Sequence, residues 1–213
     1  MRVLTVSDRV EPLLYDHFDR QQFEHVELIL ACGDLPSGYL SFPPRSVNAP
    51  LYFVRGNHDL RHDRAPGGCT HLAHDLAEFK GKSILGLEGS RWYNGGPNQY
   101  TDREMYWKIQ RLRPRLWWRK GIDIVITHAP PRHIHDAEDR CHRGFKSFRW
   151  LIEKYSPAYF IHGHIHAHFS DASQRITLYN RTRVINTYGY YMFDMDAKND
   201  SGELLKTDLE PRG

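Results

Sequence analysis

The sequence has few cysteines, no long apolar run and no strong excess of either charge. Its three cysteines, Cys32, Cys69 and Cys141, are scattered and odd in number, which argues against a disulfide framework and favours a reducing compartment. No stretch approaches the roughly 18 consecutive apolar residues of a membrane span. The first ten residues also lack the apolar segment of a secretory signal. We therefore expect a cytoplasmic protein that has no membrane partner.

The composition of the 213 residues is that of a globular domain. Charged residues make up 26% and hydrophobic residues 40%, which argues against disorder. The net charge of +3 excludes neither an acidic ligand nor nucleic acid. We expect one domain over residues 1–196, followed by a polar, weakly ordered tail over 197–213. The composition does not indicate an oligomeric state.

Five short apolar runs predict strands that are buried on both faces. They cover residues 2–7, 26–32, 51–54, 122–127 and 159–161. More β-like sequence follows over 83–88 and 176–193. Helices are predicted over 11–18, 102–111 and 145–155, with a further short helix that starts at Pro114 and ends before Gly121. The pattern indicates a mixed α/β domain, and the number of strands suggests two sheets.

Each of the five runs ends at residues that can bind a metal. In order along the chain these residues are Asp8, Asp34, Asn57 with His58, His128, and His164 with His166. In open α/β sheets, ligands gather at the carboxyl ends of the strands, so these side chains are expected to meet. Oxygen and nitrogen ligands without thiolates suit Mn, Fe or Zn. A two-metal hydrolytic site needs a carboxylate that bridges ions about 3.5–4 Å apart. Asp34 is the best candidate, because Gly33 allows a tight turn.

Histidine is unusually frequent, and eight of the 14 histidines lie between His128 and His168. Histidine is both a common metal ligand and the usual acid–base residue near neutral pH. The alternative is a solvated stripe, because His162, His164, His166 and His168 would share one face of a strand. Gly163 favours a loop instead. We expect His162 and His168 to be structural or solvated.

The ordered motifs resemble those of the calcineurin-like metallophosphoesterases. The resemblance covers roughly residues 1–195 and rests on Asp8, Gly33-Asp34, Gly56-Asn57-His58-Asp59, His128 and Gly163-His164-Ile165-His166. It implies a four-layer α/β/β/α sandwich with two mixed β-sheets. It also implies that Asp34 bridges two metal ions. Asn57, His128 and His164 would complete the second metal site.

The same resemblance implies that Asp8 and His166 belong to the first metal site and that His58 stands beside the leaving group. The chain departs from the family pattern at one position. The first motif of the family is usually Asp-x-His, whereas this chain has Val10 in place of the histidine. Valine cannot donate to a metal. The first site is therefore expected to be the weaker one.

The resemblance implies a metallophosphoesterase that hydrolyses a phosphomonoester or phosphodiester by attack of metal-bound hydroxide. The expected cofactors are divalent ions in a dinuclear centre, with Mn²⁺ first and Fe or Zn as alternatives. The expected partner is a small phosphorylated substrate. Arg9 and Arg55 flank candidate ligands and are candidate phosphate contacts. Two alternatives stay open: a non-catalytic metal- or phosphate-binding protein with a degenerate first site, and a nuclease that uses the same centre.

A basic and aromatic segment bears on the nuclease alternative. Arg111, Arg113, Arg115, Arg119 and Lys120 alternate with Trp107, Trp117 and Trp118. Such a segment can hold a single nucleic acid strand. The favoured interpretation is an amphipathic helix pair whose tryptophans pack inward and whose arginines are solvated, so nucleic acid is a possible but not a favoured partner.

Three other polar segments give weaker signals of function. Cys69, His71 and His74 fit no strong zinc pattern and are interpreted as chance neighbours in a loop. The polar loop over 135–142 either lines the mouth of the site or is simply solvated. The glycine-rich segment over 94–98 predicts a flexible loop.

Overall fold

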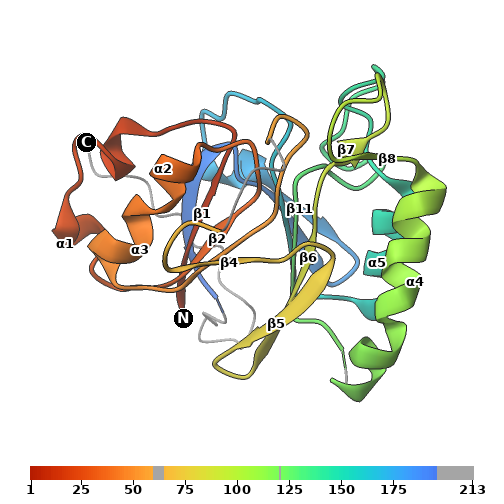
Figure 1. The fold of residues 1–213 in the computed structure, drawn as a ribbon, viewed down its shortest axis with the longest axis horizontal. Helices are drawn as coiled ribbons and strands as arrows, with labels where there is room; N and C mark the ends of the chain where they lie inside the picture. Colours follow the sequence, from red (N-terminus) through yellow and green to blue (C-terminus); the bar gives the residue numbers. More distant parts are fainter. Residues whose placement is uncertain (60–64, 120, 196–213) are drawn as a thin grey trace.

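The computed structural model describes residues 1–59, 65–119 and 121–195 and contains two mixed β-sheets (Figure 1). The first sheet has the order β13-β1-β2-β3-β4. Its strands are β13 (Gly189–Asp194), β1 (Arg2–Ser7), β2 (Val26–Ala31), β3 (Leu51–Phe53) and β4 (Cys69–His71). β1 to β4 run parallel to one another, and β13 pairs with β1 in the antiparallel direction. The carboxyl ends of β1, β2 and β3 therefore lie at one edge of this sheet.

The second sheet has the order β11-β12-β10-β9-β6-β5. Its strands are β11 (Ile176–Tyr179), β12 (Thr182–Asn186), β10 (Tyr159–His162), β9 (Ile124–Thr127), β6 (Lys82–Leu87) and β5 (Asp75–Phe79). The four central strands are parallel and the two outer ones antiparallel. A separate short pair, β7 (Ser90–Arg91) and β8 (Gln99–Tyr100), brackets the loop over 92–98.

Helices cover the outer face of each sheet, so the molecule has four layers (Figure 1). The helices on the first sheet are η1 (Pro12–Leu14), α1 (Arg20–Phe23), α2 (Ser37–Leu40) and α3 (Phe42–Val47). Those on the second are α4 (Asp102–Trp118) and α5 (Lys146–Tyr155), and a short η2 (Ala172–Arg175) precedes β11. One apolar cluster lies between the sheets and one lies under each helical layer. The predicted α/β/β/α sandwich with two mixed sheets is confirmed.

The prediction of one helix over 11–18 is wrong. The chain forms a 3-10 turn over Pro12–Leu14, and α1 begins only at Arg20. The side chain of Asp19 accepts a hydrogen bond from the Gln21 amide at 2.9 Å, so the N-terminal cap lies later than the apolar pattern suggested. Leu14 is buried and anchors the turn.

Two predictions for the segment of α4 are also wrong. Pro114 does not start a second helix but lies inside a single helix that runs from Asp102 to Trp118. Proline has no amide hydrogen, so the Gln110 carbonyl one turn earlier lacks its usual helical donor. Pro114 stands on the exposed side of the helix, where that carbonyl can bond water instead. The tryptophans do not pack inward either. Trp107, Trp117 and Trp118 are exposed, because a row of four other side chains faces the core: Met105, Ile109, Leu112 and Leu116.

Within the part of the chain that the structure describes, no helix has both the length and the apolar content needed to cross a membrane. The tail predicted over 197–213 and Lys120 lie outside the described residues.

Candidate metal centre

The carboxyl ends of the parallel strands of both sheets meet at one place. Asp8 follows β1, Asp34 and Asn57 follow β2 and β3, and His128 and His164 follow β9 and β10 of the other sheet. The His164 amide donates to Asp8 Oδ2 at 2.9 Å, which joins the two sheets. The six predicted ligands thus come from five strand ends that the fold brings together.

His128 lies at the middle of one half of this centre. Its Nε2 atom is 3.1 Å from Asn57 Oδ1, 3.0 Å from His164 Nδ1 and 3.3 Å from Asp34 Oδ2. Metal–ligand bonds of about 2.0–2.2 Å place the ligands of one ion roughly 3–3.5 Å apart. Three candidate ligand atoms therefore lie 3.0–3.3 Å from His128 Nε2, and together the four atoms, two oxygens and two nitrogens, have the chemistry of ligands to a divalent ion. We call this half the His128 half.

Backbone carbonyls fix the tautomers of the two histidines. His128 Nδ1 lies 2.8 Å from the Cys32 carbonyl and His164 Nε2 lies 2.7 Å from the Cys141 carbonyl. A carbonyl oxygen can only accept, so each of these nitrogens carries the hydrogen. The other ring nitrogen of each histidine is thereby directed at the neighbouring candidate ligands, which is how metal-binding histidines are usually oriented.

The charges of the centre couple His128 to the carboxylates. Burial lowers the pKa of His128, but the charge of Asp34, a contact with its carboxylate and the charge of Asp8 raise it to about 9. Burial raises the pKa of Asp34, and the nearby His128 outweighs it, so that the pKa falls to about 2. Burial and the charge of His128 lower the pKa of His164 to about 4. In the metal-free protein, the positive charge of protonated His128 thus stabilises the negative charges of Asp34 and Asp8, as a bound cation would.

The other half consists of Asp8 and His166, with Asp34 shared. Asp8 Oδ1 is buried, no hydrogen-bond donor among the described residues reaches it, and His166 Nε2 lies 3.4 Å away. Ligand atoms of Asp8, Asp34 and His128 lie within 4.8 Å of one another. A buried carboxylate oxygen that faces an imidazole at ion-pair distance fits a bound cation. His166 stacks on Tyr188, and its side chain is 60% exposed. We call this half the Asp8 half.

Val10, which stands where the family pattern has histidine, is 40% exposed. Its isopropyl group offers no donor atom. Arg9 pairs with Glu11 at 3.4 Å, with 54% of its own side chain exposed. The Asp8 half therefore has an open side that the His128 half lacks.

Three of the candidate ligands have an unusual backbone conformation. Asp8, Asp34 and His164 have φ values of 62°, 56° and 67°, in the left-handed region that non-glycine residues rarely adopt. Aspartate and histidine are among the residues that tolerate this conformation, and residues held in it often occur at functional sites. The backbone also packs closely against two of these carboxylates. A Cβ at Gly56 would overlap the Asp34 carboxylate and one at Gly163 would overlap Asp8, so both positions require glycine.

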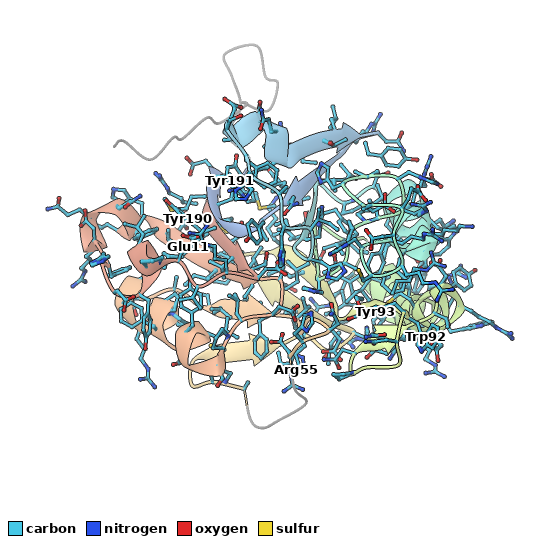
Figure 2. The ribbon with its side chains drawn as sticks, turned by 90° about the horizontal axis from the view of Figure 1, so that it is seen from above. Glu11, Arg55, Trp92, Tyr93, Tyr190 and Tyr191 are labelled. Atoms are coloured by element: carbon cyan, nitrogen blue, oxygen red, sulfur yellow. The ribbon has the colours of Figure 1, made fainter. Side chains whose placement is uncertain are left out.

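Three further residues support the centre, and their roles were not predicted. Asp59 Oδ2 accepts from the amides of Asp34 and Gly56, both at 2.8 Å. Asn98, which is buried, donates to the carbonyls of Gly56 and Asp59 at 2.9 and 3.0 Å. Asn57 Nδ2 donates to the Tyr93 hydroxyl at 3.1 Å, which turns Oδ1 towards His128. Tyr93 lies beside Trp92 in the loop between β7 and β8 (Figure 2). Only the Gly56–Asp59 motif gave a sequence signal for any of these contacts.

The remaining predicted site residues lie at the rim. His58 is exposed, and its amide donates to Asp34 Oδ1 at 2.9 Å. Arg55 is half-buried and lies near enough to Glu88 to lower the pKa of that carboxyl, together with the stronger contact to His71.

His162 is fully buried between Gly163 O and His135, in agreement with a structural role.

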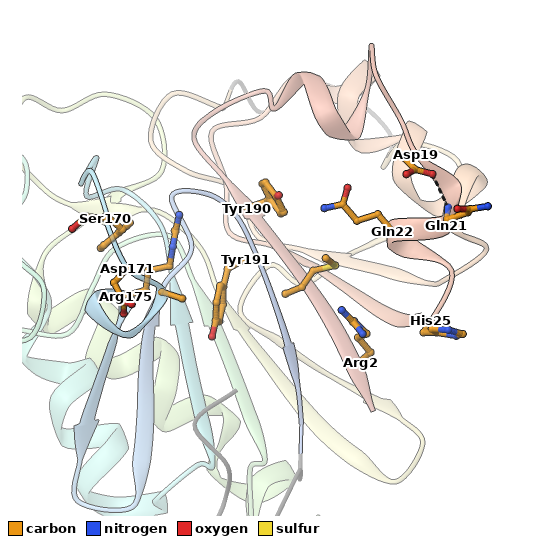
Figure 3. Close-up of a pocket in the computed structure, with 13 residues that line it drawn as sticks. Arg2, Asp19, Gln21, Gln22, His25, Ser170, Asp171, Arg175, Tyr190 and Tyr191 are labelled. Carbon is orange, nitrogen blue, oxygen red and sulfur yellow. Dashed lines mark hydrogen bonds between the residues drawn. The ribbon is translucent and has the colours of Figure 1, made fainter. Parts of the chain in front are cut away.

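Two other groups lie apart from the centre. Cys69 Sγ donates to the Leu40 carbonyl at 3.3 Å, whereas His71 bonds Glu88 at 2.8 Å. The side chains of Cys69, His71 and His74 therefore do not converge on one metal position. A polar cavity of about 760 Å³ lies beside β13 (Figure 3). It is lined in part by Arg2, Gln22, Arg175 and Tyr191, and it includes none of the candidate ligands.

A family model described as calcineurin-like phosphoesterase matches residues 7–168. A search of curated proteins found no match. The fold resembles the crystal structure of TT1561 of Thermus thermophilus, with 14% identity and a TM-score of 0.60, covering 88% of this chain and 89% of that one. It also resembles a putative 5'-nucleotidase from Staphylococcus aureus solved with alpha-ketoglutarate, with 14% identity and a TM-score of 0.52. The alignment covers 95% of this chain and 52% of the nucleotidase. At this identity the likeness concerns the fold alone.

Proposed function

Since the chain belongs to the calcineurin-like phosphoesterase family, we propose that it is a hydrolase that cleaves a phosphomonoester or phosphodiester with the help of divalent metal ions. The observation that carries the proposal is the group of three candidate ligand atoms around His128 Nε2, with the histidine tautomers fixed by the Cys32 and Cys141 carbonyls. The buried Asp8 Oδ1 supports a second ion. The oxygen and nitrogen ligands suit Mn²⁺, Fe or Zn, and we favour a dinuclear Mn²⁺ centre in a cytoplasmic enzyme.

In this proposal, Asp34, Asn57, His128 and His164 would hold one ion, and Asp8, Asp34 and His166 the other. When bound, the ions would supply a hydroxide at neutral pH and offset the charge of the phosphoryl oxygens. The protein holds the ligands in place through Asp59 and Asn98. Tyr93 keeps the Asn57 amide oriented.

His58 is proposed to act on the leaving group. Its amide is held by Asp34 while its ring is exposed at the rim, where it can reach a substrate oxygen without being a ligand. A proton donated from the imidazole to the leaving alkoxide would complete the cleavage. Arg9 and Arg55 are proposed contacts for phosphate oxygens.

The test is metal analysis of the purified protein, coupled to turnover of an aryl phosphate and an aryl phosphodiester. We expect bound divalent metal and metal-dependent turnover of at least one ester. Metal without turnover of either would favour the non-catalytic binding protein, for which the exposed Val10 and His166 are the specific observation. Neither metal nor turnover, after incubation with Mn²⁺, Fe²⁺ and Zn²⁺ in turn, would overturn the proposal.

A further inference from the structure

The outward face of α4 carries three exposed tryptophans. Trp107, Trp117 and Trp118 are 54%, 84% and 78% exposed. At about 100° per residue, Trp107 and Trp118 lie on the side of the helix opposite the buried row, and Trp117 lies on the adjoining exposed side. Tyr106 packs against both Trp107 and Trp150 of α5, so the aromatic surface continues onto the next helix. Large apolar side chains gathered on one exposed face commonly mark an interaction surface. We call this surface the α4 tryptophan face.

Along the part of α4 that carries these tryptophans, the charged side chains of the helix itself are all basic. From Met105 to Arg119 the helix has no acidic residue. Its two acids lie in the first turn and are engaged, since the Glu104 carboxylate accepts from the amide of the N-cap residue Thr101 and Asp102 accepts from the Lys146 amide of α5. Arg115 and Arg119 pair with Asp75 and Glu78 of β5.

Arg111 and Arg113 differ from those two arginines. Among the described residues no ion pair is found for either, and Arg113 bonds only the neutral Gln110 at 3.1 Å. Positive charge is therefore left over beside the tryptophans. A partner of opposite charge is favoured, and a second copy of the same face is disfavoured because like charges would meet.

The shape of the α4 tryptophan face narrows the class of partner. α4 forms the outermost layer on its side of the molecule (Figure 1), and the three tryptophans on it are exposed. Proteins that hold single nucleic acid strands combine aromatic residues with a groove that follows the strand. An outermost helix that carries exposed tryptophan and arginine instead suits a flat surface, since tryptophan prefers the headgroup region of a bilayer and arginine binds lipid phosphates.

We propose that the α4 tryptophan face docks on an anionic phospholipid surface, with Trp107, Trp117 and Trp118 in the headgroup region and Arg111 and Arg113 on the lipid phosphates. This contact needs no membrane-spanning helix. It replaces the expectation that the protein has no membrane partner. It does not depend on the proposed hydrolysis, because no residue of the α4 tryptophan face belongs to the candidate metal centre.

The experiment is flotation of the full chain with two kinds of vesicle, phosphatidylcholine alone and equal parts of phosphatidylcholine and phosphatidylglycerol, at low and high salt. We expect binding to the anionic vesicles only, and loss of that binding at high salt. Replacing Trp117 and Trp118 together by alanine should weaken binding roughly tenfold or more. Arg111→Gln and Arg113→Gln should each weaken it about fivefold. These side chains are exposed, so the variants should keep their thermal stability.

Leu178→Ala is the matched control, because Leu178 is a large apolar side chain on β11 that is 67% exposed. It should bind vesicles as the unaltered protein does. The proposal is overturned if neither vesicle is bound, or if the tryptophan variants bind anionic vesicles unchanged. It is also overturned if a single-stranded oligonucleotide binds through these residues while vesicles do not. Concentration-dependent dimerisation that the tryptophan variants abolish, without vesicle binding, would assign the face to self-association instead.

Discussion

The two halves of the candidate metal centre are built differently. In the His128 half every ring or amide is fixed at its far end, by the Cys32 carbonyl, the Cys141 carbonyl or the Tyr93 hydroxyl. In the Asp8 half, His166 is 60% exposed and Val10 contributes no donor. Side chains that are fixed before a ligand arrives lose little conformational freedom when it binds. The comparison therefore predicts one tight ion and one weaker ion.

The largest expected effect comes from the residue that both halves share. Asp34→Asn removes a charge that lies 3.3 Å from His128 Nε2 and should abolish binding of both ions, with turnover falling to background. Metal content and aryl phosphate turnover would be measured together. Asp16→Asn, which alters an exposed carboxylate away from the centre, is the matched control and should change neither. Full metal content and turnover in Asp34→Asn would contradict the shared role.

His58→Gln should separate chemistry from metal binding. His58 contributes its exposed ring at the rim and is not among the candidate ligands, so the variant should keep its metal. Turnover should fall by roughly 10²–10⁴-fold if the imidazole protonates the leaving group. The loss should shrink for esters whose leaving group needs no proton. Equal losses on good and poor leaving groups would argue against the acid role.

The dependence of stability on pH should be present in the metal-free protein and largely absent when metal is bound. The pKa of His128 is raised from 6.5 to about 9, so its contribution to the stability of the metal-free protein is complete below pH 6.5 and lost as the pH rises through 9. The contribution is at most about 3 kcal/mol. A metal ion must displace this proton, so the stabilisation by metal should grow over the same range.

Thermal unfolding with a chelator and with Mn²⁺ across this pH range would measure both trends. His128→Gln should remove most of the decline seen in the chelated protein. A chelated protein whose melting temperature does not change between neutral pH and pH 9 would show that the coupling of His128 to Asp34 and Asp8 is much weaker than the geometry indicates.

The smallest effect is expected at Val10, and it bears most directly on the difference between the two halves. The ion of the Asp8 half should dissociate first on mild chelation, and phosphate should restore it by supplying oxygens. Val10→His should tighten that ion with little gain in turnover. Metal titration of both forms, with and without phosphate, is the measurement. Two ions of equal affinity in the unaltered protein, with no effect of the substitution, would show that another residue has replaced the missing ligand.

The parts of the fold and site that follow from local pattern were predictable. Buried strands appear as apolar runs, and the residues after them, such as Asp8 and His128, meet because parallel strands place their carboxyl ends at one edge. The contacts that orient these residues were not predictable, since the Cys32 and Cys141 carbonyls carry no side-chain signature. Asn98 reaches Gly56 across 42 positions of sequence.

The errors in α4 have a common physical cause. Aromatic residues at helical spacing suggested a buried face, but four aliphatic side chains already fill the side towards the second sheet, from Met105 to Leu116. Pro114 was interpreted as a helix break because the interior of a helix usually excludes proline. Its place on the exposed side lets water reach the carbonyl that loses its helical partner, and only the folded arrangement reveals which side is exposed.

The pairing of β1 with β13 bears on biosynthesis. The strand that leads to Asp8 emerges from the ribosome early, yet its antiparallel partner spans Gly189–Asp194. One edge of β1 must therefore wait, unpaired, until the ribosome has passed residue 194, and such an edge is open to pairing with other chains in the meantime. By then all six candidate ligands have been synthesised. The sheet that carries Asp8 and Asp34 is thus completed only after the last ligand, His166, has joined the chain.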